Sequence, residues 1–197
     1  MNSLKKGFTL VELLIVIAIL AVLAAAVVIV LNPAELLAQA RDSQRINDLN
    51  TLRTALSIYV SQSTSIDLGV CAAGGRCTAN PGAGNGPFAT TTCDESGITT
   101  NNTVAGSGWV DVDFSSIPGG SPIPFLPVDP SNNANYFYAY MCSETPNYTF
   151  ELNGRLESEK HRAKMEDDGG NKNDCALNGW TDVTCFYELG TEAGLDL

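Results

Sequence analysis

The 197-residue chain has a single histidine, His161, and lacks a CxxC pair, a nucleophile motif and a glycine-rich phosphate loop. Structural zinc sites need several cysteine or histidine ligands at short spacings. General acid, general base and nucleophilic catalysis each need a tuned and suitably placed side chain. We therefore expect no zinc site and no enzymatic activity.

Basic residues are also scarce, with 11 Lys and Arg against 22 Asp and Glu and a net charge of -11. From residue 63 onward the imbalance is larger, with 6 Lys and Arg against 18 Asp and Glu. An acidic surface of this kind repels polyanions. The bulk charge therefore predicts that nucleic acid is not a partner.

No cysteine occurs before residue 71, whereas six lie between residues 71 and 185. An even number of cysteines confined to one part of a chain is typical of disulfides formed in an oxidising compartment. Six cysteines allow 15 pairings, and the sequence does not choose among them. Cys71 with Cys77 and Cys175 with Cys185 are candidates for local pairs. The disulfide candidates are Cys71, Cys77, Cys93, Cys142, Cys175 and Cys185.

Long apolar runs are absent except at residues 13–31, which are 19 consecutive apolar residues. A run of about 20 apolar residues is long enough for a helix to cross a bilayer. Lys5 and Lys6 precede the run, and no basic residue follows it before Arg41. The positive-inside rule then predicts a single pass through the cytoplasmic (inner) membrane, with residues 1–7 inside and the distal part outside.

A secretory signal peptide is the alternative interpretation of this run. The small residues Ala24, Ala25 and Ala26 could precede a signal peptidase cut. The apolar core of a signal peptide is usually about 7 to 15 residues long, which is shorter than this run. A carboxylate at the edge of the run, Glu12, is also unusual for a signal peptide, because an ionisable group in a membrane needs a partner.

Residues 7–12, Gly-Phe-Thr-Leu-Val-Glu, lead directly into the apolar run. This segment resembles the prepilin processing motif of type IV pilins and type II secretion pseudopilins. The resemblance implies cleavage between Gly7 and Phe8 by a prepilin peptidase, which also methylates the new amine of Phe8. Glu12 becomes the fifth residue of the mature chain and pairs with the amine of a neighbouring subunit during assembly. Alternatively, Glu12 stabilises only the N-terminus of its own helix.

The resemblance also implies partners and a role. The partners are copies of the chain in a helical filament, the prepilin peptidase, a platform membrane protein and an assembly ATPase, with membrane lipid around the helix before assembly. The expected role is a structural pilus subunit for adhesion, motility or DNA uptake, and the filament lies on the cell surface or in the periplasm. The alternatives are a major-type pseudopilin acting in protein export and a membrane-anchored or secreted binding module.

After Asn32-Pro33 the apolar residues recur at three- and four-residue steps, which predicts an amphipathic helix packed on a sheet. Pro33 should kink or interrupt the helix. Many pilins carry a helix proline four residues earlier, where this chain has Ile29. The charged residues Arg41, Asp42, Arg45, Asp48 and Arg53 should face neighbouring subunits or water. The predicted apolar stripe is Leu36, Ala40, Ile46, Leu49, Leu52, Leu56, Tyr59 and Val60.

In the distal part, the residue pattern predicts an irregular connection over residues 63–108. It also predicts strands at 109–114, 136–141 and 148–152. The last two strands should form a hairpin, and Asn153-Gly154 should turn the chain back through residues 155–158. The segment from 126 to 158 resembles the sheet region of small pilins. We therefore expect an α+β pilin fold, with residues 1–7 as the cleaved leader, 8–31 as the transmembrane and filament-core helix, 32–62 as the amphipathic helix and 63–197 as the extracytoplasmic β-rich domain.

An acidic, glycine-containing loop follows the predicted sheet. Calcium prefers oxygen ligands on a flexible loop, and major pseudopilins bind calcium in a loop after the sheet. The calcium candidates are Asp167, Asp168, Asn171 and Asp174. The spacing does not match an EF-hand, and a solvated acidic turn is the alternative, so we expect no required cofactor.

Overall fold

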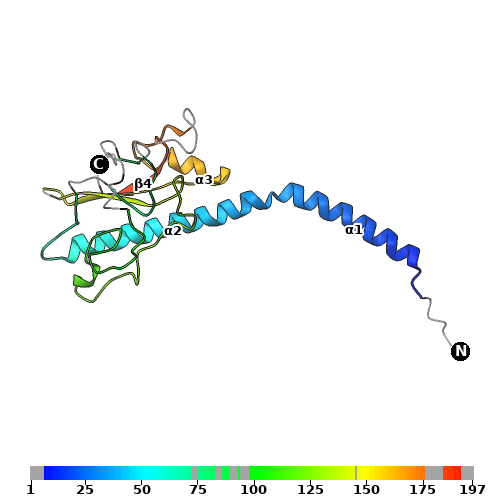
Figure 1. Ribbon diagram of the computed structural model, residues 1–197, viewed down its shortest axis with the longest axis horizontal. Helices are drawn as coiled ribbons and strands as arrows, with labels where there is room; N and C mark the ends of the chain where they lie inside the picture. The colour runs from blue at the N-terminus through cyan, green and yellow to red at the C-terminus, as the bar shows by residue number, and fades with distance from the viewer. Residues whose placement is uncertain are drawn as a thin grey trace. The chain divides into compact units, whose positions relative to one another are not determined.

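The computed structural model describes residues 7–71, 75–82, 86–88, 93, 98–144, 146–175 and 184–191. In chain order (Figure 1) the helices and strands are α1 (Leu10–Leu31), α2 (Pro33–Gln62), β1 (Arg76–Cys77), the 3-10 helix η2 (Phe114–Ser116), β2 (Ala139–Ser143), β3 (Thr149–Gly154), α3 (Glu159–Arg162), the 3-10 helix η3 (Ala163–Met165) and β4 (Tyr187–Gly190).

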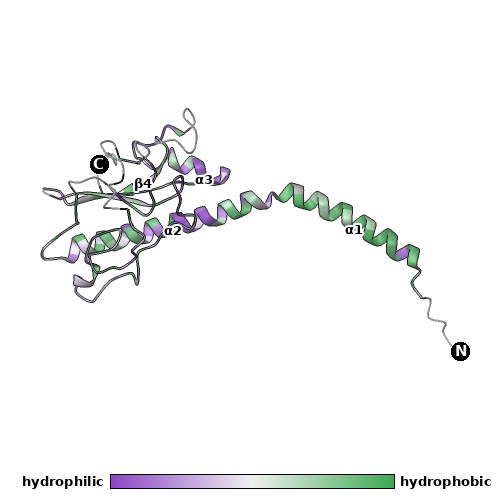
Figure 2. Cartoon of the chain, viewed as in Figure 1, coloured by the Kyte–Doolittle hydropathy of each residue, from purple (hydrophilic) through white to green (hydrophobic). Residues whose placement is uncertain are grey.

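The chain divides into two compact units, Met1–Leu37 and Ala38–Leu197. The first unit contains α1, and Figure 2 shows hydrophobic residues along most of this helix, with a hydrophilic position near its start. Leu10–Val28 is long and apolar enough to cross a membrane, and none of it is buried within the chain itself. An apolar surface of this extent needs lipid or other protein around it.

Helices α1 and α2 are separated at Asn32, directly before Pro33. Asn32 has a φ of 40°, in the left-handed region that commonly ends a helix. Pro33 is the first residue of α2, where its fixed φ fits and its missing N–H costs no hydrogen bond. The interruption thus falls where the sequence predicts it.

Four antiparallel strands form one sheet in the order β1-β2-β3-β4. The predicted hairpin is present, since β2 pairs with β3 through partners such as Tyr140 with Leu152 and Cys142 with Phe150. The long N-terminal helix, the small antiparallel sheet and the disulfides confirm the predicted α+β pilin fold.

The predicted turn at Asn153-Gly154 is wrong. These residues are the last two of β3 and pair with Glu188 and Tyr187 of β4, so residues 155–158 are not a strand. A β-carbon added to Gly154 would lie 2.9 Å from Leu49 Cδ1 of α2. Glycine is therefore required here for the close approach of helix and strand, not for a turn.

The predicted strand over residues 109–114 is also wrong. Trp109, Val110 and Val112 are fully buried, but the segment is irregular and ends in η2. The aspartates of this segment do not face a paired strand: Asp113 caps η2 through Ser115 N, and Asp111 accepts a hydrogen bond from the distant Val70 N. Alternating burial here comes from packing onto the core and not from strand pairing.

The main core lies between α2 and one face of the sheet (Figure 1). A second cluster covers the other face. Leu36 and Ala40 of the predicted stripe are exposed, because Leu36 precedes the first buried residue of α2, Ala38, and Ala40 lies off the face formed by Ala38, Asp42 and Arg45. The main core contains Leu49, Leu52, Leu56, Tyr140, Phe150 and Leu152, and the second cluster contains Cys77, Cys93, Phe137 and Phe186.

Two of the charged residues expected on the surface of α2 are buried. Asp42 and Arg45 have no exposed surface, whereas Arg53 is exposed as predicted. Arg45 pairs with Asp129 and Asp42, so its charge is compensated inside the domain. The periodicity of α2 does not reveal that Asp42 and Arg45 are buried, because a charged residue looks the same in the sequence whether it is in a buried ion pair or in water.

All six cysteines form disulfides, Cys71 with Cys142, Cys77 with Cys93 and Cys175 with Cys185. The candidate pair Cys175–Cys185 is present, and the candidate pair Cys71–Cys77 is wrong. Cys77 lies in β1 and pairs with Cys93, whereas Cys71 pairs with Cys142 in β2. Strand pairing, which brings β1 beside β2, therefore decides the connectivity more than sequence spacing does.

Candidate functional site

The predicted cleavage junction lies in an extended segment ahead of α1. Phe8 is 76% exposed, and a β-carbon added to Gly7 would meet no atom within 4 Å. Peptidases act best on exposed chain that is free of secondary structure. The junction between Gly7 and Phe8 therefore has the accessibility that processing requires.

Thr9 and Glu12 form a capping box at the start of α1. Glu12 N donates to Thr9 Oγ1 over 3.2 Å, while Thr9 N and Thr9 Oγ1 donate to Glu12 Oε2 over 2.8 and 2.7 Å. The box satisfies backbone N–H groups that a helix start leaves unpaired. Sequence reasoning missed Thr9, although Thr-x-x-Glu before an apolar run is the recognised signal for this cap.

The capping box shows what Glu12 does in a single subunit. Its carboxylate binds the N-terminus of its own helix, which is the intramolecular alternative stated above. Cleavage after Gly7 would place the new Phe8 amine next to Thr9 in the sequence. Pairing of Glu12 with the amine of a neighbour stays a prediction.

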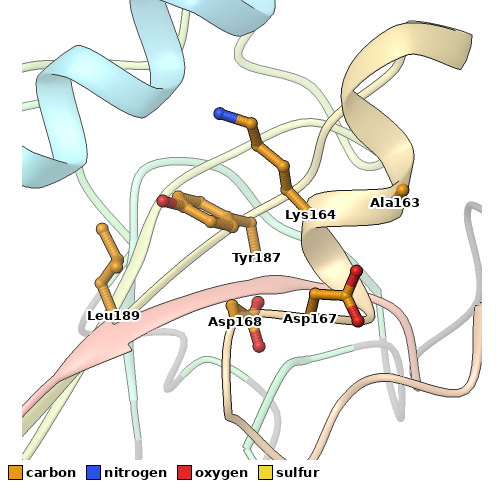
Figure 3. A pocket seen from close by; sticks show the side chains of 6 residues that line it. All are labelled: Ala163, Lys164, Asp167, Asp168, Tyr187 and Leu189. Carbon is orange, nitrogen blue, oxygen red and sulfur yellow. The ribbon is translucent and has the colours of Figure 1, made fainter.

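The calcium candidates do not converge among the described residues. Asp168 accepts hydrogen bonds from Gly170 N (3.0 Å) and Glu188 N (2.8 Å), so backbone donors already contact both of its carboxylate oxygens. Asp167 is exposed at the edge of a cavity of about 300 Å³, beside Lys164 (Figure 3). The part of the chain that the structure describes contains no group of three Asp, Glu, His or Cys side chains able to hold a metal. Calcium binding by Asp167, Asp168, Asn171 and Asp174 stays a prediction.

Two acidic side chains that the sequence analysis did not single out are buried on the sheet. Glu188 of β4 is fully buried and Glu151 of β3 is 1% exposed. Lys172 N donates to Glu188 Oε2 over 2.6 Å, whereas Glu188 Oε1 has no partner among the described residues. Burial, and then the nearby charges of Glu151 and Asp168, raises the pKa of Glu188 to about 9.

This raised pKa predicts a pH-dependent stability. The folded state binds the Glu188 proton more tightly than the unfolded state, so its contribution to stability falls as the pH rises from the ordinary range of a glutamate toward 9. Glu188→Gln keeps an acceptor for Lys172 N and cannot ionise. We expect the variant to be more stable than wild type by several kcal/mol, up to about 6 kcal/mol, at pH 9 and equally stable at pH 4, measured by urea denaturation.

The control for this measurement is Glu159→Gln, which changes an exposed acid in α3. It should leave the pH profile of the unfolding free energy unchanged. Equal slopes for Glu188→Gln and wild type between pH 5 and about 9 would show that Glu188 ionises normally in the folded domain.

Comparison with known protein families gives one match. Residues 2–28 match the family described as the prokaryotic N-terminal methylation motif. Searches of curated proteins and of solved structures find no significant match to the chain. The matched residues include the exposed junction, the capping box and most of α1. The chain thus carries the prepilin-type N-terminal methylation motif of type IV pilins and pseudopilins.

Proposed function

We propose that the chain is a structural subunit of a type IV pilus-like helical filament. One observation carries the proposal: the methylation motif includes most of a helix whose apolar surface is not buried by the residues that the structure describes. Full burial of one Leu, Ile or Val side chain contributes about 1.5 to 3 kcal/mol. Lipid before assembly and neighbouring helices after assembly would both provide that burial.

The proposed mechanism starts with processing. The peptidase removes residues 1–7 and methylates Phe8, and Glu12 then lies four residues along the chain from the new amine, which is ahead of α1. In a bundle of such helices a carboxylate can neutralise the amine of the neighbour. A charge pair in an apolar environment stabilises strongly when complete and destabilises when one partner is missing. Glu12 would therefore set the register of subunit addition.

Membrane extraction needs energy from outside the subunit. Withdrawal of Leu10–Val28 from lipid would expose its apolar side chains to water unless other helices replace the lipid at once. This supports a platform membrane protein and an assembly ATPase as partners. Lys5 and Lys6 support an orientation with the N-terminus in the cytoplasm and Ala38–Leu197 outside.

A major-type pseudopilin is the alternative, because pilins and pseudopilins share the motif. A pilus subunit forms long surface fibres, whereas a pseudopilin forms short periplasmic filaments. Electron microscopy of cells that express the chain, with an antibody against it, tests the proposal. Labelled surface fibres that disappear without the prepilin peptidase support a pilus, and a peptidase-processed chain without surface fibres supports a pseudopilin.

Gly7 offers a test of processing that does not disturb the fold. A larger side chain at residue 7 has open space around it, so Gly7→Leu should leave the capping box and the globular unit unchanged. We expect this variant to accumulate uncut, with at least about a tenfold loss of mature chain, because the peptidase must accept the residue at the cut. Mass spectrometry of the membrane fraction measures the ratio of uncut to cut chain. Normal cutting of Gly7→Leu would contradict the assignment of the junction.

A further inference from the structure

A cluster of charged side chains is buried where α2 enters the globular unit. The unit begins at Ala38, and the next buried positions of α2 are Asp42 and Arg45. The buried apolar core positions of α2 begin one turn later, at Leu49. A pulling force that arrives along the chain from residues 8–37 therefore reaches the charged cluster before it reaches the core.

Arg45 forms five hydrogen bonds through its guanidinium group, which matches the number of N–H donors that it has. Nε and Nη2 donate to Asp129 over 2.7 and 3.2 Å, and Nη2 also donates to Ser131 Oγ over 3.0 Å. Nη1 donates to Asp42 Oδ1 over 2.9 Å and to Glu157 Oε1 over 3.1 Å. The guanidinium carbon also lies 4.8 Å from the centre of the Tyr136 ring.

Asp42 extends the cluster to the start of α3. Its carboxylate accepts hydrogen bonds from Ser158 N over 2.7 Å and from Glu157 N over 3.0 Å. Ser158 is the N-cap of α3, and Arg41 pairs with Glu157 at the edge of the cluster. Two neighbouring turns of α2 are thereby tied to two distant segments, residues 129–131 and residues 157–158.

Equilibrium stability does not explain a cluster of this kind. Replacement of a complete buried ion cluster by apolar side chains is often neutral or stabilising, because burial of the charges costs about as much as their attraction returns. What the cluster provides is a set of directional contacts, which hold α2 at one position along its axis. Apolar contacts are non-directional, whereas charge-assisted hydrogen bonds require donor and acceptor within about 3 Å. A shift of α2 by one residue, about 1.5 Å, would break several of them together and leave charges unpaired.

We propose that Arg45, Asp42, Asp129 and Glu157 form a mechanical clamp that holds α2 in the globular unit when the subunit is pulled along its N-terminal helix. The proposal rests on the proposed function, in which the subunit is drawn from the membrane into a filament. Force on the membrane helix passes into α2 through the continuous chain, and the clamp lies at the end of the packed segment where that force enters.

Single-molecule force measurements test the clamp. The full chain, purified in detergent micelles and tethered by peptide tags at its two ends, is held at constant force, and the lifetime of the folded unit is recorded. Cys71 is the first disulfide residue, so α2 can detach and extend while all three disulfides stay intact. In the variant Arg45→Met/Asp129→Asn, a side chain of similar length replaces the donor, and the charge of Asp129 is removed. Asp42 keeps its hydrogen bonds from Glu157 N and Ser158 N, and Glu157 keeps Arg41.

We expect the lifetime under force to fall by at least about tenfold in this variant, because several charge-assisted hydrogen bonds are lost together. The urea midpoint without force should change little. The matched control is Arg76→Gln, which breaks the half-buried Arg76–Asp111 pair (3.3 Å) away from α2 and should keep the wild-type lifetime within about twofold. If the double variant does not fold, Arg45→Lys is measured instead, because lysine keeps the charge and lacks the planar fork.

An unchanged lifetime in the double variant, or in Arg45→Lys where that is used, would overturn the proposal. So would an equal loss of lifetime in Arg76→Gln. Because the measurement uses single purified subunits, its result does not depend on whether cells assemble filaments. Absence of filaments in cells would overturn the proposed function and leave the ratio of lifetimes unaffected.

Discussion

Glu12→Ala is expected to abolish filament formation while leaving the globular unit folded. In the proposed bundle each Glu12 carboxylate compensates an amine buried among apolar helices, and a buried charge left without its partner costs about 3 to 5 kcal/mol. Repeated at every subunit, that cost should reduce filament number by at least about a hundredfold. Glu12 lies in α1, outside the unit Ala38–Leu197, so the urea midpoint of that unit should not change. Filaments are counted by electron microscopy.

Thr9→Ala is the matched control for this prediction. It breaks the capping box at a cost of about 1 kcal/mol and keeps the carboxylate of Glu12. If Glu12 acts between subunits, filaments should persist in Thr9→Ala and disappear in Glu12→Ala. Equal loss in both variants would show that the carboxylate acts only through its own helix. Normal filaments in Glu12→Ala would remove Glu12 from assembly altogether.

Removal of the Cys71–Cys142 disulfide is expected to cause the largest loss of stability within the globular unit. This bond closes a loop of 71 residues and joins the segment after α2 to β2. In the chain-entropy account, Cys71→Ser/Cys142→Ser should lower the free energy of unfolding by about 4 kcal/mol, because a long loop gains the most freedom in the unfolded chain. Guanidinium denaturation of the oxidised proteins measures the loss.

The short disulfide provides the comparison. Cys175 and Cys185 are separated by 10 residues, so Cys175→Ser/Cys185→Ser should lower the free energy of unfolding by about 3 kcal/mol. Cys142, Cys175 and Cys185 are buried and Cys71 is partly buried, so the short-loop variant loses at least as much packing as the long-loop variant. A larger loss for the short loop would contradict the loop-entropy account and point to packing at Cys175 and Cys185 instead.

The sequence predicts best those features that are set by neighbouring residues. The apolar run defines α1, Asn32-Pro33 separates the two helices, and alternation predicts the hairpin of β2 and β3. Features that depend on contacts between residues far apart in the sequence were either not predicted or predicted wrongly. Asn153-Gly154 has the composition of a turn, yet both residues lie in β3 because they pair with Glu188 and Tyr187 of β4.

The same distinction applies to the candidate site. Gly7, Phe8 and Glu12 form a local motif and could be identified from sequence, as could Thr9 from its spacing to Glu12. The buried cluster around Arg45 could not, because its partner Asp129 is 84 residues away and an amphipathic pattern assigns charges to the surface. Burial of Glu188 was missed for the same reason, since β3 and the segment from Asp168 to Lys172, which are distant in sequence, contact it.

The N-terminus of the chain recovered from cells is the most direct test of processing and assembly through the helix. N-terminal sequencing and mass spectrometry of the protein from cells with an active prepilin peptidase should show a chain that starts at Phe8 and carries one added methyl group. A chain that still starts at Met1, or one that starts after Ala26 as a secreted protein would, contradicts the account.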